Sequence, residues 1–182
     1  MQKNRIILGL SCISIFITLT GCASSAPSTK SPYIGPEQVA RLQSEAILQG
    51  VLDKDAEAIA NLFCPYMKEN YPNLEEDIEI WIDFIDGDIL SYDAPKGAMG
   101  SGTWTAEDGL VEGSINGRVE NVKTSSGKTY RIGHGGYSVY KEHPDYVGVT
   151  SITIFVEDLY DYENHCYLEG GKCIIYLPEM YE

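Results

Sequence analysis

Apolar side chains recur at helical spacing over the stretch that follows the first 35 residues. A helix is predicted to begin at Pro36-Glu37 and to end or bend at Gly50, with Gln and Glu on its outer side. Its predicted inner face carries Val39, Leu42, Ala46 and Ile47. This spacing is typical of an amphipathic helix that packs on a core along one side.

Two more helices are predicted before Gly87. The acids of segment 53–55 favour the start of the second helix, and Pro65 ends it. Its inner face is expected to hold Ile59, Leu62 and Phe63. Asn73 with Glu76 resembles a capping box for the third helix, and Gly87 suits the left-handed position beyond its last turn. The apolar stripe of this helix consists of Leu74, Ile78, Trp81, Ile82 and Ile85.

The pattern after Gly87 changes to strands rich in Val, Ile, Thr and Tyr that are separated by turn residues. The predicted strands are 89–93, 97–105, 117–124, 129–141, 146–157 and 173–177. Imperfect alternation in 146–157 predicts a bent strand with a bulge, and the glycines of 133–136 allow the sheet to curve. Helices followed by antiparallel strands predict an α+β domain over residues 37–182, with its N-terminal helices packed on a strongly curved antiparallel sheet.

The first 22 residues have the pattern of an export signal. Lys3 and Arg5 precede an apolar stretch, 6–19, which is too short to span a bilayer comfortably. The following Leu19-Thr20-Gly21-Cys22 resembles a bacterial lipobox, which predicts a signal peptide over 1–21 and lipid attachment at Cys22. The alternative is an uncleaved membrane anchor that contains a chance cysteine. Two acyl chains on one residue give stable anchoring, so the expected location is the extracytoplasmic face of a bacterial membrane.

Residues 22–36 are rich in Ser and Pro and predict a flexible, lipidated tether. The whole chain has 27 acidic and 13 basic side chains, a formal net charge of −14. Loss of Lys3 and Arg5 with the signal leaves 11 basic residues and a net charge of −16. Because phosphate binding needs a basic surface, this charge argues against a nucleic-acid partner.

Three cysteines lie in the predicted domain. Cys166 and Cys173 would face each other if 166–173 formed a hairpin with its turn at Glu169-Gly170, and export would permit a disulfide between them. Against the disulfide, a two-residue turn would make them a hydrogen-bonded pair, which has the wider Cα separation. Both outcomes stay open. Cys64 lies among apolar residues and is expected to be buried and unreactive.

Three segments carry a resemblance to known families. Residues 46–63 (AILQGVLDKDAEAIANLF) resemble the first helices of the ketosteroid-isomerase-like, or nuclear transport factor 2-like, cone fold. Segments 85–89 (IDGDI) and 147–152 (VGVTSI) resemble the sequences of a bacterial lipoprotein family, domain of unknown function 5104. The resemblance implies a curved sheet wrapped around the third helix, with a pocket at the open end of the cone. It implies no catalytic residue, since fold does not determine activity.

No residue pattern identifies a catalytic centre, a cofactor or a metal site. The three histidines, His134, His143 and His165, lack the spacing of zinc ligands, and the acids around the third helix do not match a calcium loop. His134 lies between glycines that permit close approach of another group, although a structural role fits it as well. The candidate pocket residues are Trp81, His134 and Tyr137.

Two functions are compatible with these observations. The first is a non-catalytic lipoprotein whose domain binds a small molecule or a protein. The second is a pocket enzyme of the isomerase or dehydratase type, with an Asp base and a Tyr or His donor converging on one point. Homodimerisation, which is common in the cone fold, is a further expectation.

Overall fold

The computed structural model describes residues 34–161, 163 and 166–176. The predicted signal peptide and tether lie almost entirely outside this range, as does His165. No helix among the described residues has both the length and the hydrophobicity needed to cross a membrane. The compact unit begins at Ile34.

Four helices come first along the described chain: α1 (Pro36–Asp53), α2 (Ala56–Ala60), α3 (Pro65–Asn70) and α4 (Leu74–Asp83). Helix α1 passes through Gly50 and ends at Asp53, and Lys54 caps it. The Asp55 side chain accepts a hydrogen bond from the Ala58 amide (2.8 Å) and caps α2, as its position predicts. Asn73 makes no side-chain cap, so the predicted capping box is wrong. Helix α3 was not predicted, because Pro65 begins a helix as well as ending the previous segment.

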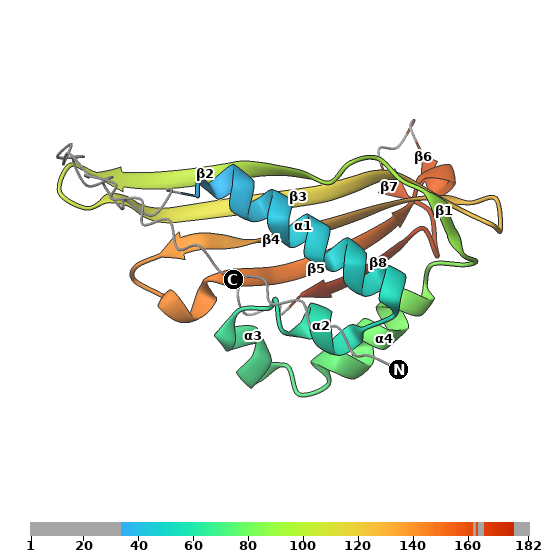
Figure 1. Ribbon diagram of the computed structural model, residues 1–182, viewed down its shortest axis with the longest axis horizontal. Helices are drawn as coiled ribbons and strands as arrows, with labels where there is room; N and C mark the ends of the chain where they lie inside the picture. The colour runs from blue at the N-terminus through green and yellow to red at the C-terminus, as the bar shows by residue number, and fades with distance from the viewer. Residues whose placement is uncertain (1–33, 162, 164–165, 177–182) are drawn as a thin grey trace, which may run out of the picture. The chain divides into compact units, whose positions relative to one another are not determined.

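The strands are β1 (Ile89–Ser91), β2 (Lys96–Thr105), β3 (Gly109–Thr124), β4 (Thr129–Tyr140), β5 (Gly148–Val156), β6 (Tyr160–Asp161), β7 (Cys166–Tyr167) and β8 (Lys172–Tyr176). Antiparallel pairing in the order β1-β3-β4-β5-β8, with β2 also on β3, forms one sheet, and β6 pairs with β7. Figure 1 shows α1 lying across the strands near β2 and β3, and α4 near β8. The predicted α+β class is confirmed.

The sheet is irregular where the sequence predicts it. The β4–β5 register shifts between Gly135 and Gly136, so that Thr150 is the extra residue of a bulge on β5. Val149 and Thr150 are consequently both buried, although neighbours along a regular strand face opposite sides. A second shift lies between Val119 and Val122 on β3. Bulges bend strands and increase their twist, which accounts for the curl of this sheet.

Helix α1 lies very close to the backbone of the sheet at two glycines. A Cβ atom on Gly97 would lie less than 3.0 Å from the backbone of Arg41, and one on Gly117 less than 3.0 Å from the Ser44 side chain. Small side chains, Ala40 and Ser44, therefore form the inner face at the N-terminal end of α1. The prediction that Leu42 faces inward is wrong, since it is 42% exposed.

Side chains from all four helices and from the helix-facing side of the sheet fill the core. Its largest fully buried members are Trp81, Tyr130, Phe63, Ile47, Ile59, Met67, Ile78, Ile115, Ile132, Ile152, Ile154 and Val119. The predicted stripe of α4 is buried at Leu74, Ile78, Trp81 and Ile82. The space between helices and sheet is thus occupied by side chains, and cavities lie at its margin and on the outer face of the sheet.

Candidate functional site

The three candidate pocket residues lie in different environments. Trp81 is fully buried on α4, and its indole N–H has no hydrogen-bond acceptor. The His134 ring projects from β4 toward α1, although the residue also lines one cavity at the sheet, and Tyr137 lines the cavity next to it. None of the four cavities described below is lined by all three.

His134 joins α1 to the sheet. Its Nε2 lies 3.0 Å from the Ala40 carbonyl oxygen and 3.1 Å from Ser44 Oγ, which also lies 3.0 Å from the Lys96 carbonyl oxygen. Because a carbonyl only accepts, Nε2 carries the proton and Nδ1 is the buried, unpaired acceptor. Burial lowers the pKa of His134, more than the Ala40 contact raises it, which favours the neutral ring. This geometry assigns His134 a structural role.

A cavity of about 320 Å³ lies between the ends of α1 and α4 and the start of β1. We call it the α1–α4 pocket; its lining residues are Val51, Leu52, Lys54, Ile82, Ile85, Gly87, Asp88 and Ile89. Five of the eight residues are aliphatic, and the charged ones are Lys54 and Asp88. Neither charged side chain forms an ion pair with another described residue. An aliphatic wall with a few polar groups is typical of small-molecule sites.

Lys54 stands in a backbone conformation that favours glycine. Its φ is 55° and its ψ is 39°, the left-handed region, directly after the last turn of α1. The Asp55 amide donates to the Gly50 carbonyl oxygen (2.8 Å) and the Lys54 amide to that of Val51 (3.3 Å), as in a Schellman motif. A non-glycine residue here carries a backbone cost, and such costs concentrate at functional sites.

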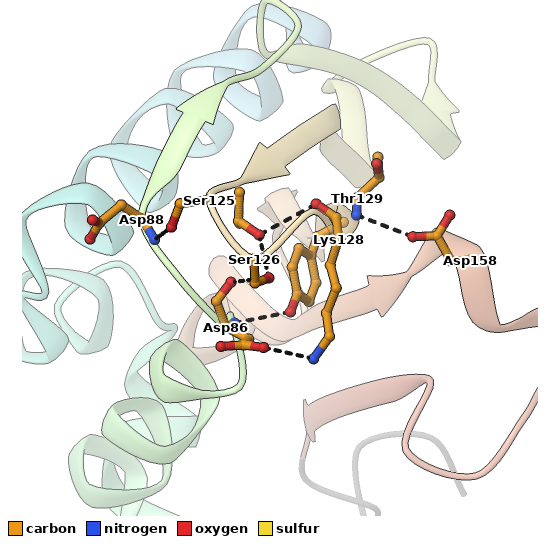
Figure 2. Close-up of polar contacts among 9 residues, drawn as sticks. Asp86, Asp88, Ser125, Ser126, Lys128, Thr129 and Asp158 are labelled. Carbon is orange, nitrogen blue, oxygen red and sulfur yellow. Dashed lines mark hydrogen bonds and ion pairs between the residues drawn. The ribbon is translucent and has the colours of Figure 1, made fainter.

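The opposite wall of the pocket is fixed by the β3–β4 turn. Asp88 exchanges two hydrogen bonds with Ser125: its amide donates to Oγ (2.9 Å), and its carbonyl oxygen accepts from the Ser125 amide (2.8 Å). Ser126 Oγ donates to the Asp86 carbonyl oxygen (2.9 Å), and the Asp86 amide donates to the Tyr130 hydroxyl (2.9 Å). Figure 2 shows the contacts made by the Ser125 and Ser126 side chains, with the Asp88 carboxylate pointing away from the turn.

An ion pair and a glycine complete this support. Lys128 Nζ lies 2.9 Å from Asp86 Oδ2 (Figure 2). Gly87 has a φ of +84°, and a Cβ there would approach Ser125 and Ser126 to less than 3.0 Å. The loop that holds Asp88 is therefore positioned by contacts within the chain, and preorganisation of this kind lowers the entropic cost of binding at a site.

Two further cavities, of about 340 and 530 Å³, adjoin each other over the outer face of the sheet. We call them together the sheet-face groove. Their shared lining consists of Asn116, Gly135, Ser151 and Thr153. Tyr137 and Tyr176 line one end, and Arg118 and Arg131 the other. Both arginines already have acidic partners within the chain, Glu120 (2.9 Å) and Glu157 (3.5 Å), respectively.

Two of the described carboxylates have defined partners within the chain. Glu120, in the groove, is bound by Lys96 and Arg118, and the hydrogen bond from Lys96 together with both charges lowers its pKa. Tyr71 donates to Asp77 Oδ2 (2.7 Å), away from all four described cavities. Burial and this contact with Asp77 raise the pKa of Tyr71 to about 12.

The segment around Cys166 and Cys173 differs from a simple hairpin. The Gly171 amide donates to the Leu168 carbonyl oxygen (2.8 Å), so the predicted turn at Glu169-Gly170 exists. The flanking strands pair elsewhere: Cys166 opposes Asp161, and Cys173 opposes Ile154. Cys173 is a free thiol in the structure, whereas the Cys166 side chain lies outside the described residues, so the disulfide stays a prediction. Cys64 is fully buried, as expected, and burial raises the pKa of its thiol.

Among the described side chains, no group of three His, Cys, Asp or Glu is arranged to hold a metal ion. The residues that sequence reasoning missed are Lys54 and Asp88. The one local signal for Lys54 is a lysine at the left-handed position that follows a helix. This signal can be recognised only when the end of α1 is known. Asp88 acquires its position from Ser125, 37 residues away, which no local pattern reveals.

Comparison with known proteins gives a family and no described activity. No curated protein matches the chain. The family described as domain of unknown function 5104 matches residues 46–158, more than half of the sequence. That match spans α1 from its third turn to the end of β5, and it includes every residue of the α1–α4 pocket. The chain therefore belongs to the family described as domain of unknown function 5104.

Proposed function

We propose that this protein is a bacterial lipoprotein, anchored through Cys22 on the extracytoplasmic face of a membrane, whose domain binds a small molecule without catalysis. The proposed binding site is the α1–α4 pocket. The lipobox-like sequence supports the anchor. The aliphatic lining supports the ligand site, together with Lys54 and Asp88, which form no ion pair with another described residue. The ligand that fits is a molecule with an aliphatic body and a charged head.

The proposal includes a ketosteroid-isomerase-like cone for the domain. The curled antiparallel sheet with helices on one face supports it, together with the resemblance of residues 46–63 to the first helices of that fold. The α1–α4 pocket is then the opening that remains where the helices do not close the sheet, since its walls come from helix ends and β1.

The observation that carries a binding role is the composition of this pocket. Its charged groups are a lysine and an aspartate, and no Tyr or His side chain lines it. An Asp base with a Tyr or His donor needs both groups within hydrogen-bond reach of one point on the substrate, and this pocket offers Asp88 without either donor. An isomerase or dehydratase with an Asp base is the alternative, and the Tyr71–Asp77 hydrogen bond is the contact that favours it.

Ligand binding is tested by native mass spectrometry and thermal denaturation of the exported domain, with aliphatic carboxylates and aliphatic amino acids as probes. Leu52→Glu places a charge at the pocket, and Leu42→Glu is the matched control on the same helix, outside it. The two leucines are similarly exposed, 39% and 42%. Wild type and Leu42→Glu should retain a ligand or be stabilised by a probe, and Leu52→Glu should not. Equal behaviour of both variants would place binding elsewhere.

The anchor is tested separately by labelling cells with radioactive palmitate. Wild type should incorporate label and sediment with membranes, whereas Cys22→Ser should do neither. Cys12→Ser, which changes the other cysteine of the N-terminal segment, is the control and should behave as wild type. Label that persists in the Cys22→Ser protein would contradict lipidation at this residue.

A further inference from the structure

The floor of the sheet-face groove is formed by glycines of β4. Two rows of opposing residues cross β3, β4 and β5 here: Asn116, Gly135 and Ser151, and beside them Arg118, Gly133 and Thr153. Between the two glycines, His134 points toward α1, so both rows face the other way, because side chains alternate along a strand. A Cβ on Gly133 would lie 2.8 Å from Thr153 Oγ1, and one on Gly135 3.0 Å from Ser151 Oγ. The two hydroxyls therefore stand directly beside an open floor.

The polar side chains along this floor have hydrogen-bonding capacity that the chain does not use. The Asn116 amide can donate and accept, and so can the hydroxyls of Ser151 and Thr153. None of these three side chains forms a hydrogen bond with another described residue. Asn116 is exposed, and the two hydroxyl residues are half-buried. The groove therefore favours a ligand with several groups that both donate and accept hydrogen bonds.

Two other classes of ligand fit this face poorly. Strand β4 pairs with β3 on one side and β5 on the other, so its backbone does not offer the open edge at which extended peptides usually bind. Nucleic acids and other polyanions need basic side chains to neutralise them. Arg118 and Arg131 are already paired with Glu120 and Glu157 within the chain. The favoured occupant is thus polar and uncharged.

Aromatic rings line the end of the groove away from the arginines. Tyr176 on β8 opposes Ser151 in register and is 45% exposed. Tyr137 lies just beyond the glycines of β4, and its ring centroid is 4.9 Å from that of Tyr140. A sugar ring presents C–H groups on its face and hydroxyls around its edge. It can pack on an aromatic ring while its hydroxyls bind amide and hydroxyl side chains.

We propose that the sheet-face groove binds a neutral oligosaccharide, with one sugar ring packed on Tyr176 and the next lying over Gly133 and Gly135. The hydroxyls of the second ring are then within reach of Asn116 on one wall and Ser151 on the other. Glycine is needed on the floor because any side chain there would occupy the space of the sugar. The groove shares no lining residue with the α1–α4 pocket, so this inference is independent of the ligand site proposed above.

The first test applies the full-length chain, purified in a detergent whose head group is not a sugar, to an array of neutral and acidic oligosaccharides. Neutral glycans should be bound, and acidic ones no more tightly. Isothermal titration calorimetry with the best neutral glycan should give an affinity that does not change with salt, because no net charge is neutralised. Failure to bind any neutral glycan, or a preference for acidic ones, would overturn the proposal.

The second test locates the site with variants in the same titration. Tyr176→Ala and Asn116→Ala should each weaken binding about tenfold, through loss of a ring contact or a hydrogen bond. Tyr92→Ala and Asn61→Ala are the matched controls and should bind as wild type. Tyr92 is also 45% exposed, Asn61 is exposed at the end of α2, and neither lines any of the four described cavities.

Further readouts separate this site from folding and from the α1–α4 pocket. The two groove side chains lie outside the core, so both groove variants should keep the thermal midpoint of wild type. Leu52→Glu, in the α1–α4 pocket, should leave glycan binding unchanged. The proposal would be overturned if both groove variants bound glycan as tightly as wild type, or if the control variants or Leu52→Glu weakened binding to the same extent.

Discussion

Lys54 combines an unfavourable backbone conformation with a side chain that no described residue neutralises. At the residue scale these two properties can be separated by substitution. Lys54→Gly removes both the left-handed strain and the ammonium group, whereas Lys54→Ala removes the ammonium group only. We expect Lys54→Gly to raise the free energy of unfolding by about 0.5–1 kcal/mol. This is the strain that glycine relieves minus the extra conformational entropy that glycine loses on folding.

Urea denaturation measures this effect. Lys54→Ala is the control, and it should not be stabilised. If Lys54 holds the head group of a ligand, both variants should bind aliphatic carboxylates more weakly than wild type. If Lys54→Gly is more stable than wild type and binds ligand equally well, the role of Lys54 is limited to capping α1. If Lys54→Gly is less stable than wild type, the strain argument is contradicted.

His134 predicts a pH dependence of stability with a defined sign. Burial lowers its pKa in the folded state below the ordinary value of 6.5, so the unfolded chain binds this proton more readily. Its contribution to stability is therefore present above about pH 6.5 and is lost as the pH falls through that value toward the lowered folded pKa.

The check is the slope of the unfolding free energy against pH, between neutral pH and pH 5. His134→Gln should flatten the slope by up to about 1.4 kcal/mol per pH unit, the limit for one proton. Gln retains a donor for the Ala40 carbonyl oxygen. A slope that is the same in wild type and His134→Gln would show that other groups cause the pH dependence.

At the element scale, the contact between α1 and the sheet depends on glycine more than on apolar area. A Cβ on Gly117 would meet both the His134 ring and Ser44 Oγ at less than 3.0 Å, so Gly117→Ala must displace the helix or the histidine. We expect a loss of about 2–3 kcal/mol, the range for an overpacked core position. Gly135→Ala is the matched control on the next strand, where a Cβ would meet the ends of two side chains, Ser151 Oγ at 3.0 Å and Asn116 Oδ1 at 3.6 Å.

Thermal and chemical denaturation of the two variants test this contact. Gly135→Ala should remain within about 1 kcal/mol of wild type, because a serine side chain can rotate away. Equal losses in the two variants would mean that glycine is required for strand conformation at both positions, and that close approach of α1 is not the cause.

The elements themselves were largely predictable, and their contacts were not. The stripe of α4 and the change to strands after Gly87 follow from local periodicity, which the structure preserves. The prediction for the inner face of α1 was wrong at Leu42. Periodicity favours large apolar residues on an inner face, whereas the close approach of α1 to Gly97 and Gly117 leaves room only for small side chains. The sequence also could not predict that Lys54 and Asp88 line the same pocket. The position of Asp88 depends on its hydrogen bond with Ser125 in the β3–β4 turn, which is distant along the chain.

At the scale of the whole molecule, the described unit should fold without the residues that precede it. The compact unit begins at Ile34, and its core residues all lie between Ala40 and Ile175. We expect residues 34–182 to have the same thermal midpoint as residues 22–182 carrying Cys22→Ser, with one cooperative transition as in other single domains. Circular dichroism on both proteins provides the comparison, and a lower midpoint for the shorter chain would show that segment 22–33 contributes to the fold.

The attachment of α1 to the sheet has a mechanical consequence. Any pull transmitted from the N-terminal side enters the described domain at Pro36, the first residue of α1. The first contacts to bear that load are the close backbone approach at Gly97 and the Ser44–His134 hydrogen bonds, both within the first three turns. Short-range contacts and hydrogen bonds yield over small displacements, so α1 would resist extension stiffly and then detach abruptly. A domain held at the end of a stretched tether would thus keep its pocket intact up to a threshold force.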